Sequence, residues 1–209
     1  MIWRPPQSSS QNSGENDYVK SINNKIVLQR IENSVADLFE EIDLQWHKFL
    51  KHSFTTTQQF GYIKQIKQEA SEQDSVVLQM DFSENHNLLI QHEVMQANWT
   101  AAQAAIFTAH VTVNKNKHHS IAIISDYLSH DVQFVDAAQG VIVDYLRGLY
   151  PSVKHFNYVS HGAAQHFKNN KSILNLTYHQ SDFDIPASWT FTSTAHGKRL
   201  IDGIGATTL

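Results

Sequence analysis

Three polar residues follow apolar segments that are typical of β-strands, and their side chains suit the binding of metal ions. Asp81 lies at the end of the segment at residues 75–82, and His161 directly follows the segment at residues 154–160. Asp202 comes after the last such segment, at residues 188–193. A carboxylate at the end of an apolar strand is costly unless it is hydrogen-bonded or binds a cation. If the strands end at one edge of a sheet, the three side chains converge there. Such a site would serve phosphodiester cleavage assisted by two divalent cations, Mg²⁺ or Mn²⁺.

The elements that must position these residues follow from the spacing of apolar side chains. Strand-like segments are apolar throughout or alternate, whereas helix-like segments repeat every three or four positions. The sequence predicts strands at residues 75–82, 104–114, 120–125, 154–160 and 188–193, and helices at residues 132–149 and 165–178. Short links between the first three strands predict an antiparallel meander, and the later elements predict strand-helix crossovers. This is a ribonuclease-H-like α/β arrangement, a mixed sheet with helices on its faces.

The first third of the chain has a different pattern. Residues 1–17 carry few large apolar groups, which predicts a disordered tail. Apolar residues from Ile26 to Leu50 fall three or four positions apart and predict a long amphipathic helix, and residues 58–71 predict a second helical stretch. The predicted domains are a tail at 1–17, a helical arm at 18–72 and a C-terminally truncated ribonuclease-H-like domain at 73–209. The arm either packs on this domain or associates with partners.

Composition limits the partners and the compartment. With 16 Lys and Arg against 20 Asp and Glu, the formal net charge is -4, so any contact with nucleic acid must be local. Cysteine is absent, which excludes disulfides, zinc-thiolate sites and thiol catalysis. The sequence shows neither the apolar stretch of a signal peptide nor that of a transmembrane helix. We expect an intracellular protein, nuclear or cytoplasmic, with no membrane partner.

Short motifs occur in a defined order along the chain. They are Asp81-Phe82-Ser83-Glu84-Asn85, Gln91-His92-Glu93 with Trp99, Ile124-Ser125-Asp126-Tyr127-Leu128-Ser129-His130-Asp131, Ser160-His161-Gly162-Ala163-Ala164 with Lys168-Asn169, and His196-Gly197-Lys198 with Asp202-Gly203-Ile204-Gly205-Ala206. Over about residues 45–206 this ordered set resembles a family of eukaryotic proteins derived from DNA transposons. The resemblance implies a transposase domain with three acids of the Asp-Asp-Asp/Glu type, and DNA as its partner. By position, Asp81 matches the first acid, His161 stands in the place of the second, and Asp202 is the candidate for the third.

Two departures from the family pattern predict a degenerate or fragmentary copy. His161 replaces an acid, and at 4 Å with an effective dielectric constant of about 20 one pair of unit charges is worth about 4 kcal/mol. Imidazole also suits Zn²⁺ or Mn²⁺ better than Mg²⁺. The chain stops at Leu209, before the helix that follows the last motif in the family. We therefore expect nuclease activity to be weak or absent.

Several residues have a second interpretation. Asp81 could cap a turn through Asn85, and His161, directly before Gly162, could be an ordinary turn histidine. Lys168, Lys171, Lys198 and Arg199 would contact phosphates if they lie near the catalytic edge, or are ordinary solvated surface. Asp126, His130 and Asp131 resemble a metal cluster, but Asp131 is well placed to cap the helix that follows.

Another class of function also fits the sequence. A decayed copy would act as a catalytically inactive module that binds nucleic acid or protein, with the helical arm, at residues 26–72, forming homo-oligomers or binding other partners. Measured uptake of Mn²⁺ separates the two classes. A serine hydrolase based on Ser160 is disfavoured because the Gly-x-Ser-x-Gly spacing is missing.

Overall fold

The computed structural model describes residues 14–22, 25–70, 74–83, 85–87, 102–193 and 203–204, of which residues 14–33 are described by their backbone alone. The chain divides into two compact units, Met1–Phe54 and Thr55–Leu209. The second unit therefore begins earlier than the predicted boundary at residue 73. Within the described residues, no helix is both long enough and apolar enough to cross a membrane.

The first unit contains an antiparallel hairpin of β1, Gly14–Ile22, and β2, Lys25–Asn33. This corrects two expectations, because residues 14–17 lie in a strand instead of a disordered tail, and the helix predicted from Ile26 does not start there. The cause is an ambiguous pattern: Ile26 and Leu28 fit a period of two as well as a helical stripe.

Helix α1, Val35–Glu69, begins directly after the hairpin. Ser34 accepts a hydrogen bond from the Asp37 backbone N–H at 3.2 Å through Oγ, and the Asp37 carboxylate accepts one from the Ser34 N–H at 3.0 Å. This reciprocal capping satisfies donors that the first helical turn leaves without partners. The two predicted helical stretches are one continuous helix, since no proline separates them.

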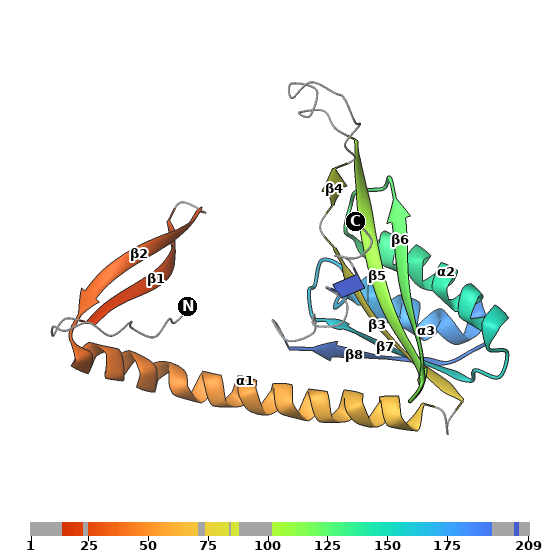
Figure 1. The fold of residues 1–209 in the computed structure, drawn as a ribbon, viewed down its shortest axis with the longest axis horizontal. Coiled ribbons are helices and arrows are strands. Elements are labelled where there is room, and N and C mark those ends of the chain that lie inside the picture. The colour runs from red at the N-terminus through yellow and green to blue at the C-terminus, as the bar shows by residue number, and fades with distance from the viewer. Residues whose placement is uncertain are drawn as a thin grey trace. The chain divides into compact units, whose positions relative to one another are not determined.

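The second unit is built on a mixed β-sheet whose elements are shown in Figure 1. Its strands are β3, Ser75–Phe82; β4, His86–Asn87; β5, Gln103–Asn114; β6, Lys117–Ser125; β7, His155–His161; and β8, Ala187–Thr192. The main strands run in the spatial order β6-β5-β3-β7-β8. β3, β5 and β6 form the predicted antiparallel meander, whereas β7 is parallel to β3 and β8 is parallel to β7. The predicted mixed α/β sheet is therefore confirmed.

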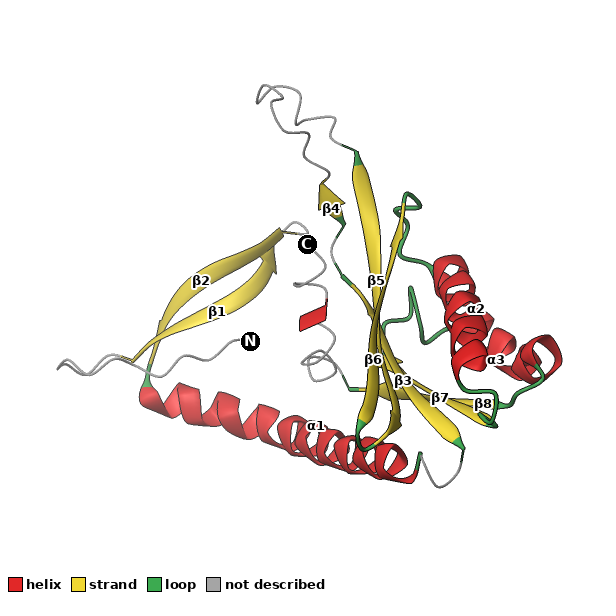
Figure 2. Cartoon of the chain, turned by 45° about the vertical axis from the view of Figure 1, so that its right-hand side comes forward, coloured by secondary structure: helices red, strands yellow, loops and turns green. Residues whose placement is uncertain are grey.

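Two helices cover one face of this sheet, as Figure 2 shows. α2, Val132–Leu149, matches its predicted bounds, and Asp131 caps it by accepting a hydrogen bond from the Phe134 N–H at 3.0 Å. α3, Asn170–Phe183, begins five residues later than the predicted start at 165, because Asn169 is the cap and residues 164–169 form turns. The capping interpretation of Asp131 is thus confirmed.

Each face of the sheet has its own apolar cluster. Alternate residues of β3 point to opposite faces, so Val76, Leu78 and Met80 pack under α2 and α3. On the other face, Val77 of β3 and Val159 of β7 pack with Ile63 and Ile66 of α1 and with Ala70, which directly follows α1. These contacts explain why the compact unit includes the end of α1.

Candidate functional site

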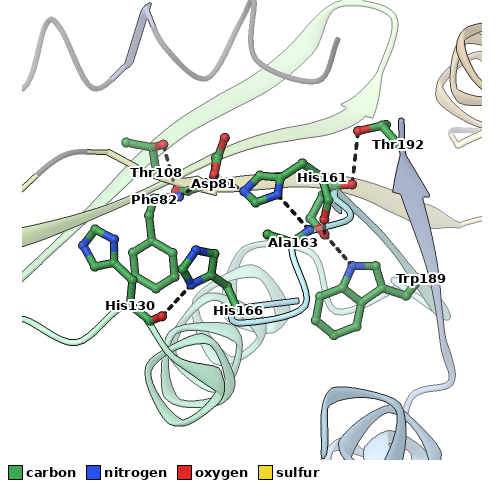
Figure 3. A network of polar contacts seen from close by, with 10 residues as sticks. Asp81, Phe82, Thr108, His130, His161, Ala163, His166, Trp189 and Thr192 are labelled. Carbon is green, nitrogen blue, oxygen red and sulfur yellow. Dashed lines mark hydrogen bonds and ion pairs between the residues drawn. The ribbon is translucent and has the colours of Figure 1, made fainter. Parts of the chain in front are cut away.

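Asp81 and His161 come together because their strands are parallel neighbours in register. Gln79 of β3 pairs with Val159 of β7, and each of the two site residues lies two positions further along its strand. A period of two keeps side chains at such positions on one face of the sheet. The predicted convergence of these two residues at one end of the sheet is therefore what the structure shows (Figure 3).

The Asp81 carboxylate is held by two donors at one oxygen. His161 Nε2 lies 2.9 Å from Asp81 Oδ1, and the same oxygen accepts a hydrogen bond from the Phe82 backbone N–H at 2.8 Å. Asp81 is only 5% exposed. A buried carboxylate without such donors would be strongly destabilising, so these contacts account for its presence in the sheet.

The other nitrogen of His161 fixes the position of the ring proton. The Ala163 backbone N–H donates a hydrogen bond to His161 Nδ1 at 3.1 Å, so Nδ1 carries no proton. In the neutral ring the proton then lies on Nε2, which donates it to Asp81. With both ring nitrogens engaged, His161 has no lone pair directed at a metal ion or at a substrate proton.

Polar residues behind the pair tie β7 to β8. Trp189 Nε1 donates to Ser160 Oγ at 3.0 Å, and Thr192 Oγ1 donates to the Ser160 carbonyl at 3.3 Å. A cavity of about 10 Å³ is lined by residues of β3, β7 and β8, among them Asp81, His161 and Thr192. That volume is about the minimum for a single water molecule.

A histidine-rich cluster lies beside Asp81, around the ring of Phe82 (Figure 3). His130 stacks on Phe82 with ring centroids 4.2 Å apart, and the His166 ring lies 5.4 Å from Phe82. His130 Nε2 bonds Asn85 Oδ1 at 2.7 Å, and His166 Nδ1 bonds the His130 carbonyl at 2.5 Å. Burial lowers the pKa of His130, and His166 adds to this effect while Asp81 opposes it. The shift favours the neutral form of His130.

The end of β8 next to the site is held by α1. Gln59 Nε2 donates to the Phe191 carbonyl at 2.9 Å, and Gln59 Oε1 accepts from the Ser193 N–H at 2.8 Å. Thr56 and Ser193 share a hydrogen bond of 2.7 Å between their hydroxyl groups. The sequence alone does not predict these contacts. Hydrogen bonds between residues far apart in the chain produce no periodic pattern.

The remaining predicted site residues divide into two groups. Asp202, Lys198 and Arg199 lie outside the described residues. Lys168 and Lys171 are exposed and flank Asn169, the N-terminal cap of α3, so both lie on the segment that follows β7 and His161. His130 was noted in the sequence within a possible metal cluster, but His166 was missed. No periodic pattern marks His166, because it lies in the turns of residues 164–169 and reaches Phe82 and His130 through tertiary contacts.

The described residues do not fit a resident Mg²⁺ or Mn²⁺. Among them, no group of three or more His, Asp or Glu side chains is arranged to hold a metal ion. Asp81 Oδ1 already has two donors, and His161 presents no free lone pair. In this arrangement the pair excludes a two-metal centre built on Asp81 and His161.

Comparison with known proteins places the second unit in a family. Residues 59–208 match a family model described as a domain of unknown function, DUF8701. The chain belongs to this family. The DUF8701 match begins inside α1, close to the start of the compact unit at Thr55. No curated protein and no solved structure matches the chain.

Proposed function

We propose that the DUF8701 domain is a ribonuclease-H-like domain of transposase descent that binds nucleic acid without cutting it. The strand order β6-β5-β3-β7-β8, with β5 antiparallel to its neighbours, supports the descent because it is the order expected of this fold. The observation that supports a loss of cleavage is the closed contact of Asp81 and His161, in which both imidazole nitrogens are engaged. By the resemblance to transposon-derived proteins, this imidazole would stand where an acid is expected.

Binding of nucleic acid is proposed at the start of α3. Backbone N–H groups at a helix N-terminus and nearby basic side chains together favour phosphate. Lys168 and Lys171 flank this terminus and are exposed, and Lys168 lies 5.8 Å from the ring centre of Phe191. The net charge of -4 restricts such binding to a local patch of this kind.

Metal-assisted phosphodiester cleavage is the second candidate, and the adjacency of Asp81 and His161 at a sheet edge favours it. Mg²⁺ or Mn²⁺ would be its cofactor. This activity has two requirements. The hydrogen bond between His161 and Asp81 must break, and Asp202 must supply a further carboxylate.

One set of DNA-binding and plasmid-nicking measurements separates these proposals. In gel retardation, the whole chain is expected to bind duplex DNA. For the double variant Lys168→Glu/Lys171→Glu, we expect the slope of the logarithm of the binding constant against the logarithm of the salt concentration to be smaller in magnitude by about two, one for each lost phosphate contact. Lys64→Glu/Lys115→Glu, which changes the charge equally at exposed positions elsewhere, is expected to leave that slope unchanged. Supercoiled plasmid is expected to stay intact with Mg²⁺ or Mn²⁺.

Two results would contradict the proposal. Nicking that Asp81→Ala abolishes would establish a live metal nuclease. Equal losses of DNA affinity in the two double variants would show that the start of α3 is not the binding site.

A further inference from the structure

The N-terminal half of α1 carries an exposed seam of large apolar side chains. Val35, Phe39, Ile42, Trp46 and Phe49 are spaced alternately four and three residues apart. Their exposed fractions lie between 43% and 66%, and the rings of Trp46 and Phe49 stack with centroids 5.5 Å apart. Alternating spacings of four and three average 3.5 residues, which is the repeat of a left-handed coiled coil. The seam is therefore shaped to pack against another helix.

Charge along the same half of α1 selects the direction of that helix. Acidic residues come first and basic or histidine residues follow: Asp37, Glu40, Glu41 and Asp43, then His47, Lys48, Lys51 and His52. Two copies side by side in parallel would place like charges together. In the antiparallel direction, the acidic half of one copy lies along the basic half of the other. These charges lie mostly outside the seam, so they decide direction more than affinity.

The apolar layers are also complementary in the antiparallel direction. With a two-fold axis beside Leu44, Ile42 lies opposite the partner's Trp46, and Phe39 lies opposite the partner's Phe49. Each layer then combines one a position with one d position, as antiparallel coiled coils require. Leu44 itself points away from the seam.

We propose that the protein forms a homodimer through an antiparallel two-helix coiled coil of residues 35–53, centred at Leu44. This surface lies entirely within the unit Met1–Phe54, so the inference does not depend on the function proposed for the second unit. We take the partner to be a second copy of the chain, because the apolar seam and the charges of one copy match those of an antiparallel second copy.

Sedimentation of the whole chain at tens of micromolar tests the association. We expect a dimer for the native chain and for the control Leu44→Glu, which changes the most exposed apolar residue of the segment, at 75%, outside the seam. Ile42→Glu is expected to be a monomer with unchanged circular dichroism, and Phe39→Gln serves as a second seam variant. A monomeric native chain, or a dimer that survives both seam substitutions, would overturn the proposal.

Spin labels test the direction, and the absence of native cysteine makes single labelling straightforward. Lys51→Cys and Leu44→Cys lie one heptad apart on the same outer face. In the antiparallel dimer the two labels at 44 lie at the same level along the axis, on opposite outer sides of the coiled coil, whereas those at 51 are also about 21 Å apart along the axis, from 1.5 Å per residue. Equal label separations for the two variants would indicate a parallel dimer and overturn the proposal.

Discussion

At the scale of single residues, the hydrogen bonds of each histidine decide its chemistry. His161 receives a backbone N–H at Nδ1 and so donates from Nε2 to Asp81, which leaves it unable to ligate a metal as it stands. His179 is similarly fixed, since Nδ1 donates to the Ile185 carbonyl at 2.6 Å and Nε2 accepts from the Tyr158 hydroxyl at 2.7 Å. Burial raises the pKa of Tyr158, so this phenol stays protonated and can donate.

The His179 contacts predict how stability depends on pH. Burial lowers the pKa of His179 below its ordinary value of 6.5, outweighing the Ile185 carbonyl and Asp182, which raise it. The unfolded chain therefore binds a proton more readily, so the free energy of unfolding is greatest above pH 6.5 and falls as the pH drops through the folded pKa. The slope from this residue is at most about 1.4 kcal/mol per pH unit.

Urea denaturation between pH 7.5 and 5 checks this prediction. His179→Gln removes the titrating group, so the loss of stability on acidification is expected to be smaller than in the native chain. An NMR titration of His179 is expected to give a pKa below 6.5. A folded pKa above that value would contradict the argument.

At the scale of elements, the sequence predicts most of the second unit and little of the first. Strands β3, β5, β7 and β8 and helix α2 lie within a few residues of their predicted bounds, because buried strands and amphipathic helices leave distinct periods. The hairpin of β1 and β2 was missed because apolar residues of β2 fit a period of two as well as a helical period.

The candidate site was also predictable only in part. That Asp81 and His161 meet was predictable, because a crossover places the fourth strand parallel to the first. The tautomer of His161 was not predictable, since it depends on the Ala163 N–H in the turn after β7.

Packing of α1 on the sheet gives an element-scale prediction. Ile63 is 5% exposed and packs with Val77 and Val159, although it lies before the predicted domain boundary at residue 73. Ile63→Ala is expected to lower the free energy of unfolding of this unit by about 2–4 kcal/mol, from lost burial and the cavity left behind. Tyr62→Ala, at a neighbouring position that is 47% exposed, is the control and is expected to change it little.

Chemical denaturation followed by tryptophan fluorescence measures both Ile63→Ala and Tyr62→Ala. Equal effects of the two substitutions would show that α1 does not stabilise the sheet.

At the scale of the whole molecule, the two units have separate tasks in this account. The first carries the hairpin and the self-complementary half of α1, and the second carries the DUF8701 sheet with its closed Asp81–His161 pair. Dimerisation would present two copies of the proposed nucleic-acid surface, which would raise the apparent affinity for long DNA. The central claim proposed for the second unit is that the His161 imidazole, by binding Asp81, closes this site to metal ions.

Calorimetric titration of the whole chain with Mn²⁺ tests that claim most directly. We expect no specific uptake by the native chain, uptake by His161→Asp because a carboxylate is restored beside Asp81, and none by His161→Asp/Asp81→Ala. Specific uptake by the native chain that Asp81→Ala abolishes would contradict the claim.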